Sequence, residues 1–132
     1  MRKAFAATVI SQCNQDDCFF LTGDLGFMAL EEVKEAFGVR FINAGVAEQN
    51  MVGVAAGLAR EGFKVFVYSI APFCYARPFE QIRNDVCLPN LPVCLVGNGG
   101  GVCLRPHGSY PSCARRLHSN ECVGCPRFGT GI

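Results

Sequence analysis

Glu48 stands at the point of this chain where residue type and spacing suggest chemistry. It opens the polar triplet Glu48-Gln49-Asn50, which lies between a strand-like run, residues 40–45, and a long apolar helix pattern that ends at Arg60. Open α/β sheets bind ligands at the carboxyl ends of their strands, so a carboxylate here is placed to hydrogen-bond a bound molecule. The alternative is that Glu48 only complements the positive end of the helix dipole.

The elements that would position Glu48 alternate along the chain as strands and helices. Short apolar runs ended by glycine or polar residues predict strands, and apolar groups at helical spacing predict helices. The predicted strands are residues 18–23, 40–43, 64–69 and 92–97, and the predicted helices are residues 2–15, 29–37, 47–60 and 77–87. This alternation predicts the α/β class: βαβ units forming a parallel sheet with helices on both faces.

Two further features of this pattern carry expectations about packing. Gly53 and Gly57 lower the intrinsic helix propensity of residues 47–60, so we expect these glycines to permit close packing on the sheet. Five cysteines between Cys13 and Cys94 are scattered through the strand and helix patterns, as free buried thiols would be.

The composition is that of one globular domain. Of the 132 residues, 50% are hydrophobic and 17% charged, which separates the chain from disordered sequences. The net charge of +1 predicts neither a nucleic-acid nor a membrane partner. No apolar run approaches the about 20 residues that a membrane-spanning helix needs, and we expect a cytoplasmic protein.

Four segments within the first hundred residues carry motifs of a known family. They are residues 21–26 (LTGDLG), 43–50 (NAGVAEQN), 68–73 (YSIAPF) and 91–97 (LPVCLVG). Together they resemble the pyrimidine-binding domain of thiamine-diphosphate enzymes of the transketolase type, most closely the separately encoded C-terminal subunit of split transketolases. Deoxyxylulose-phosphate synthases also carry the alanine–glutamate–glutamine core, but a histidine usually follows it, where this chain has Asn50.

The resemblance implies a role for five side chains. Glu48 is implied as the catalytic glutamate that hydrogen-bonds the aminopyrimidine of thiamine diphosphate, and burial would shield it from water. Phe73 matches the aromatic residue that packs on the pyrimidine, and Asp24 matches an aspartate near the cofactor. Arg77 is placed to meet a sugar phosphate, and Phe79 to wall the pocket. The alternatives are core packing for both phenylalanines, a solvated helix position for Arg77 and a turn for Asp24.

The metal of the cofactor is expected to lie in another chain. The family holds the diphosphate and its Mg²⁺ with a GDG motif and a later Asn–Asn pair, whereas Gly23-Asp24 is followed by Leu25 and no Asn–Asn pair is present. The resemblance therefore implies no metal ligand here, and an N-terminal diphosphate-binding subunit as partner. It also implies sugar phosphates as substrates, a homo-oligomer in the intact family, and an inactive chain when alone.

The character of the sequence changes after Gly101. Residues 1–101 hold eight Lys/Arg and ten Asp/Glu, whereas residues 102–132 hold four arginines and one acid, with four cysteines. Family members continue with a segment resembling GFxYGxxGxTHHALED. When the last two bases of each codon from Val102 onward are read with the first base of the next, suitable synonyms give FAYGPMGATHHALEDY. We infer a partial domain, residues 1–101, followed by an irregular, out-of-frame tail, residues 102–132.

Two other interpretations remain open. Cys113, His118, Cys122 and Cys125 have zinc-like spacing, which would suit a metal-binding interaction module, although a shifted frame explains them without a metal. The preferred function is the pyrimidine-binding part of a transketolase that transfers a two-carbon ketol unit between sugar phosphates. The alternatives are a truncated, non-catalytic remnant and a fragment like deoxyxylulose-phosphate synthase.

Overall fold

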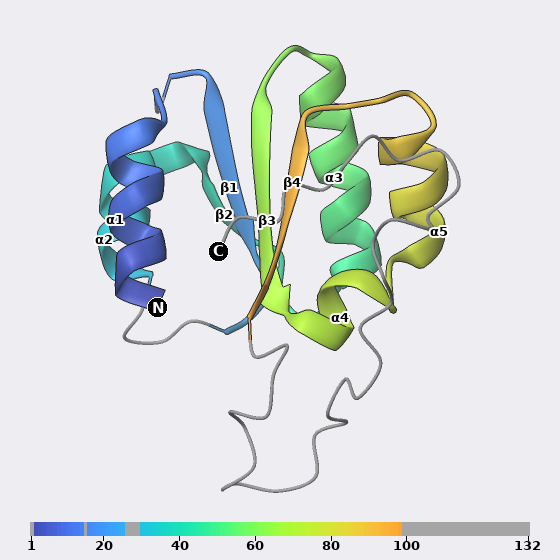
Figure 1. Ribbon diagram of the computed structural model, residues 1–132, viewed down its shortest axis with the longest axis horizontal. Helices are drawn as coiled ribbons and strands as arrows, with labels where there is room; N and C mark the ends of the chain where they lie inside the picture. The colour runs from blue at the N-terminus through green and yellow to red at the C-terminus, as the bar shows by residue number, and fades with distance from the viewer. Residues whose placement is uncertain (1, 15, 26–29, 99–132) are drawn as a thin grey trace, which may run out of the picture.

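The computed structural model describes residues 2–14, 16–25 and 30–98 (Figure 1). The predicted boundary at residue 101, the predicted tail and its zinc-like motif all lie outside these residues.

Four parallel strands form the sheet of the described chain. They are β1 (Cys18–Thr22), β2 (Phe41–Asn43), β3 (Lys64–Ile70) and β4 (Val93–Asn98), in the spatial order β2-β1-β3-β4. The chain moves from β1 outward to β2 and then returns to the other side of β1. The carboxyl ends of β1 and β3 therefore lie at a topological switch point, where open α/β sheets bind ligands.

Helices cover both faces of this sheet, as the sequence predicts (Figure 1). One face carries α1 (Arg2–Gln12) and α2 (Glu31–Phe37), which leads through a 3₁₀ turn (Gly38–Arg40) into β2. The other carries α3 (Glu48–Arg60), α5 (Phe79–Gln81) and the π-helical turn that continues it (Ile82–Cys87). A short helix, α4 (Ala71–Tyr75), joins β3 to α5 at the carboxyl edge. Among the described helices, none has the length and apolarity to cross a membrane, and the cytoplasmic location stays a prediction.

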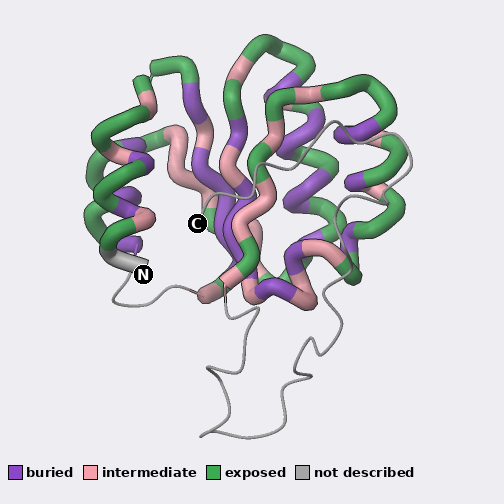
Figure 2. The backbone as a smooth tube through the Cα atoms, viewed as in Figure 1, coloured by how far each residue is buried: buried purple, intermediate pink, exposed green. Residues whose placement is uncertain are grey.

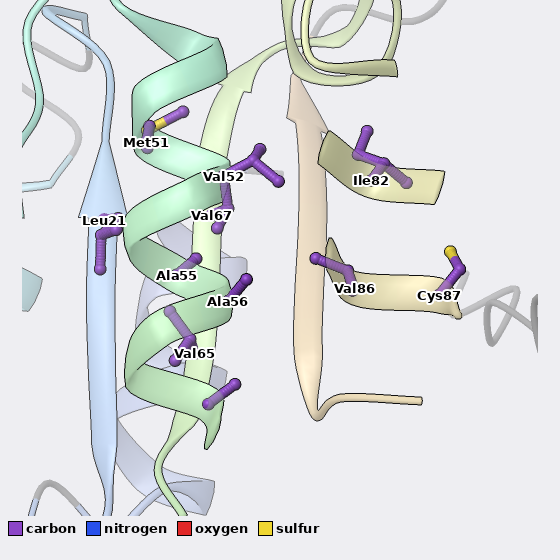
Figure 3. Packing of buried hydrophobic residues seen from close by; sticks show 11 residues of the cluster. Leu21, Met51, Val52, Ala55, Ala56, Val65, Val67, Ile82, Val86 and Cys87 are labelled. Atoms are coloured by element: carbon purple, nitrogen blue, oxygen red, sulfur yellow. The ribbon is translucent and has the colours of Figure 1, made fainter. Parts of the chain in front are cut away.

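Two separate cores hold the layers together, and buried residues line both inner faces of the sheet (Figure 2). On the α3 face, Leu21 and Val67 of the strands meet Met51, Val52 and Ala55 of the helix (Figure 3). On the other face the core is built around Phe20, whose ring stacks on two aromatic rings of the neighbouring strands. Their centroids lie 5.7 Å away in Phe41 and 6.3 Å away in Phe66. Burial of such rings is the main favourable term available to this fold.

The expected role of the α3 glycines is wrong. A Cβ atom added at Gly53 or Gly57 would meet nothing within 4 Å, because both glycines lie on the exposed side of the helix. Ala55, Ala56 and Ala59 make the close contact with the sheet instead. The small-residue pattern indicated close packing correctly but assigned it to the wrong residues.

The expectation of five free, buried thiols is only partly correct. Cys13, Cys18, Cys74 and Cys94 are free, and Cys18 and Cys74 are buried. Cys94 is exposed, because one face of β4 has no helix of the described chain over it. Cys87 takes part in a disulfide rather than carrying a free thiol.

Candidate functional site

Glu48 is a buried carboxylate at the first position of α3. Its side chain is only 4% exposed. Oε2 accepts a hydrogen bond from Nη1 of Arg77 at 2.9 Å, and Oε1 accepts a longer one from Oγ of Ser69 at 3.5 Å. A buried charge is costly unless it is paired, and here a guanidinium, a hydroxyl and the positive end of a helix all face it. The site therefore keeps an acidic group shielded from water.

A cavity of about 620 Å³ lies beside this carboxylate. It is lined by the residues that lead into α3 and form its first turn, together with one side chain from beyond α4: Val46, Ala47, Glu48, Gln49, Asn50 and Arg77. Backbone N–H groups of a first helical turn have no partner inside their own helix and can bind a ligand. The volume falls in the range of small-molecule sites, about 300–1,000 Å³.

Arg77 joins Glu48 to an aromatic ring. Its guanidinium carbon lies 3.6 Å from the ring centroid of Phe73, which α4 carries. The structure thus brings together three of the five predicted side chains, from three places in the sequence. Phe79 is 54% exposed at the start of α5 and is not among the residues that line the cavity, so its predicted role stays a prediction.

Asp24 lies in the loop after β1, at the same edge of the sheet. Its Oδ1 accepts a hydrogen bond from Nδ2 of Asn43 at 3.3 Å, and its backbone N–H donates to the carbonyl of Gly45 at 3.2 Å. Asn43 Oδ1 in turn accepts from the N–H of Gly45 at 2.9 Å. These bonds tie the end of β1 to the end of β2, which matches the turn role of Asp24. A direct role toward a cofactor stays a prediction.

Sequence reasoning missed Ser69. It lies near the end of the buried run of β3, and its side chain is completely buried against Glu48. The available signal was a hydroxyl at the carboxyl end of a strand that is otherwise mostly apolar, one strand away from Thr22. Among the described residues, no three His, Cys, Asp or Glu side chains converge in the manner of a metal site. The assignment of Mg²⁺ to a partner chain stays a prediction.

Comparison with known proteins identifies the family. A family model described as the transketolase pyrimidine-binding domain matches residues 1–115. The chain belongs to this family. The match runs past the boundary predicted at residue 101, and the shifted reading frame stays a prediction.

Curated relatives of this pyrimidine-binding domain include parts of split transketolases. The "Putative transketolase C-terminal section" of Methanocaldococcus jannaschii is 40% identical over 111 residues, which cover 83% of this chain and 35% of the relative. An apulose-4-phosphate transketolase subunit, the second of its enzyme, from Phocaeicola vulgatus is 35% identical over 119 residues, 89% of this chain and 37% of the relative. This chain thus spans about a third of the length of these two relatives.

A synthase and a solved structure are also similar to this chain. The "1-deoxy-D-xylulose-5-phosphate synthase" of Desulfotalea psychrophila is 44% identical over 73 residues, which cover 55% of this chain and 11% of that protein. A solved structure titled "Split gene transketolase, inactive beta4 tetramer" is 38% identical, with a TM-score of 0.56 over 70% of this chain and 30% of that chain.

The family implies thiamine diphosphate as cofactor, and the residues present fit its pyrimidine ring. An aminopyrimidine needs a carboxylate for a ring nitrogen and an apolar face for its plane. Glu48 offers the first beside a cavity, and Phe73 offers the second, since its ring stacks on the same arginine that pairs with Glu48. The family also accounts for the pairing of a buried acid with a neighbouring ring, which has no evident purpose in a structural helix cap.

Proposed function

We propose that this chain is the pyrimidine-binding part of a thiamine-diphosphate-dependent transketolase, which transfers a two-carbon ketol unit between sugar phosphates. The observation that carries the proposal is the carboxylate of Glu48, which is nearly inaccessible to water yet lies beside a cavity at the carboxyl edge of the sheet. The relatives named as parts of transketolases support the reaction class.

Thiamine diphosphate, when bound, would supply the carbanion on which ketol transfer depends. Glu48 would hydrogen-bond the pyrimidine nitrogen and share a proton with it, a task for which a carboxylate must be held in place and kept from water. Ser69 would orient the carboxylate by its hydrogen bond to Oε1. Phe73 would support the plane of the ring.

A partner chain would complete the enzyme. The relatives are about three times as long as the matched segment, and one of them is named as a subunit of a transketolase. We propose that the diphosphate and its Mg²⁺ are held by a separate N-terminal subunit, and that this chain is inactive alone. The solved relative, whose title describes an inactive tetramer, supports both self-association and the need for a partner.

A deoxyxylulose-phosphate synthase-like activity is the second candidate. The 44% identity to one such enzyme over 73 residues favours it. Asn50, in place of the histidine usual in that branch, favours the transketolase assignment.

Proton exchange at C2 of thiamine diphosphate tests the proposal directly. The frame-corrected chain is assembled with a diphosphate-binding subunit, and exchange into deuterated water is followed by NMR. We expect Glu48→Ala to slow exchange by about 10²–10⁴-fold without changing the circular dichroism spectrum. Glu35→Ala, at an exposed position of α2, is the matched control and should exchange at the wild-type rate. Equal rates in the Glu48 variant and the wild type would refute the assignment.

A further inference from the structure

Arg77 occupies both groups that a pyrimidine ring would use. Its Nη1 donates to Glu48 at 2.9 Å, and its guanidinium carbon lies 3.6 Å from the centre of the Phe73 ring. A guanidinium is a flat, delocalised group that offers N–H donors in its plane and stacks on aromatic faces. An aminopyrimidine has the same two properties, so the two groups contend for the same carboxylate and the same ring.

The burial of the pair indicates which member can move. The side chain of Glu48 is 4% exposed, whereas that of Arg77 is 43% exposed. Arg77 lies in the short connection between α4, which ends at Tyr75, and α5, which begins at Phe79. Turning the guanidinium outward returns it to water at little cost, because a half-exposed ion pair contributes little to stability.

The same asymmetry couples the departure of Arg77 to arrival of a ligand. Glu48 left without its partner would be an uncompensated buried charge, which is strongly unfavourable. A ring nitrogen that takes over the hydrogen bond to Glu48 removes that cost. The empty site is therefore stable only with Arg77 in place, and the filled site only with Arg77 displaced.

We propose that Arg77 acts as a built-in stand-in for the cofactor: it fills the pyrimidine position of the empty site and is exchanged for the ring on binding. The inference rests on the proposed function and adds a regulatory step to that site. It gives Arg77 a role that opposes cofactor binding, whereas a direct ligand contact would favour it.

Chemical modification of the wild-type protein distinguishes these two roles. The chain assembled with its diphosphate-binding subunit is treated with phenylglyoxal, and modification of Arg77 is followed by peptide mass spectrometry with and without Mg²⁺–thiamine diphosphate. We expect the cofactor to accelerate modification of Arg77, because the guanidinium leaves its partners. Arg83, exposed in the π-helical turn, is the internal control and should react equally in both samples. A cofactor that slows or does not change modification of Arg77 would overturn the proposal.

Affinity measurements on variants give a second, independent test. Titration calorimetry with Mg²⁺–thiamine diphosphate should show Arg77→Gln binding about fivefold more tightly than the wild type, the factor expected for removing a competing ion pair. Arg83→Gln should bind as the wild type does. Weaker or unchanged binding by Arg77→Gln, with binding abolished in Glu48→Ala, would overturn this inference alone. Absence of cofactor binding in every form of the assembled protein would overturn the proposed function as well.

Discussion

Gly97 of β4 and Ala71 of α4 lie so close that no further carbon fits between them. A Cβ atom at Gly97 would come within 3.0 Å of both Cα and Cβ of Ala71. We expect Gly97→Ala to lower the free energy of unfolding by about 1–3 kcal/mol, the usual cost of overpacking, as measured by urea denaturation. Since α4 carries Phe73, a shift of this helix should also disturb the site. Unchanged stability would show that α4 yields freely.

Gly53→Ala should act in the opposite direction. The added methyl group meets open space on the exposed side of α3, so only the gain in helix propensity remains. We expect the free energy of unfolding to rise by about 1 kcal/mol in the same urea experiment. Gly57→Ala offers a matched repeat one turn further along the helix. Destabilisation by both changes would mean that the exposed side of α3 is covered in solution.

Cys74 should make stability fall in alkaline solution. Burial is the main reason why the pKa of this thiol is raised from 9.0 to about 12. Below 9.0 both states hold the proton. Between 9.0 and about 12 the unfolded state releases it while the folded state keeps it, so the folded state loses relative stability as pH rises. The loss attributable to this thiol is at most about 1.4 kcal/mol per pH unit.

Cys74→Ala provides the comparison for this pH dependence. Urea denaturation under reducing conditions, repeated from about pH 8 to about pH 11, should give a steeper decline for the wild type than for the variant. The variant has its own constant loss from the cavity it creates, which does not affect the slope. Parallel curves would contradict the raised pKa of Cys74.

The nucleotide sequence around the codons for Gly99, Gly100 and Gly101 should show one surplus G. Its removal should let the frame continue as FAYGPMGATHHALEDY, because that segment follows the glycine run in relatives of this domain. Resequencing genomic DNA and transcript across the run decides the matter. An unaltered frame in both, with one zinc ion bound per chain, would instead favour the metal-binding interpretation of residues 113–125.

The strands and the longer helices could be predicted because each is defined by its own local pattern. β3 begins at the predicted residue, and α3 begins one residue after it, since buried apolar runs and glycine or polar boundaries act within a few neighbours. The short helix α4 was missed. It has five residues, too few for helical periodicity, and its position depends on the contact between Ala71 and Gly97, which no local pattern contains.

The candidate site divides in the same way. Glu48 could be predicted from its place between a strand and a helix and from the family motif around it. Its partner Arg77 lies 29 residues away, so the ion pair depends on how β3, α4 and α3 meet in space. The solvent exposure of Gly53 and Gly57 was likewise not readable from sequence, because a small residue in a helix signals close packing without naming the neighbour.

The position of β1 between β2 and β3 has a consequence for how the protein folds as it is synthesised. Phe20 lies opposite Phe41 on one side and Phe66 on the other. The nascent chain can place the first of these rings early, but the second becomes available only after α3 has left the ribosome. Long-range parallel pairing of this kind is slow, and until it forms one edge of β1 stays open to other chains. Translation that stalls before Ile70 should therefore yield aggregates rather than a smaller folded unit.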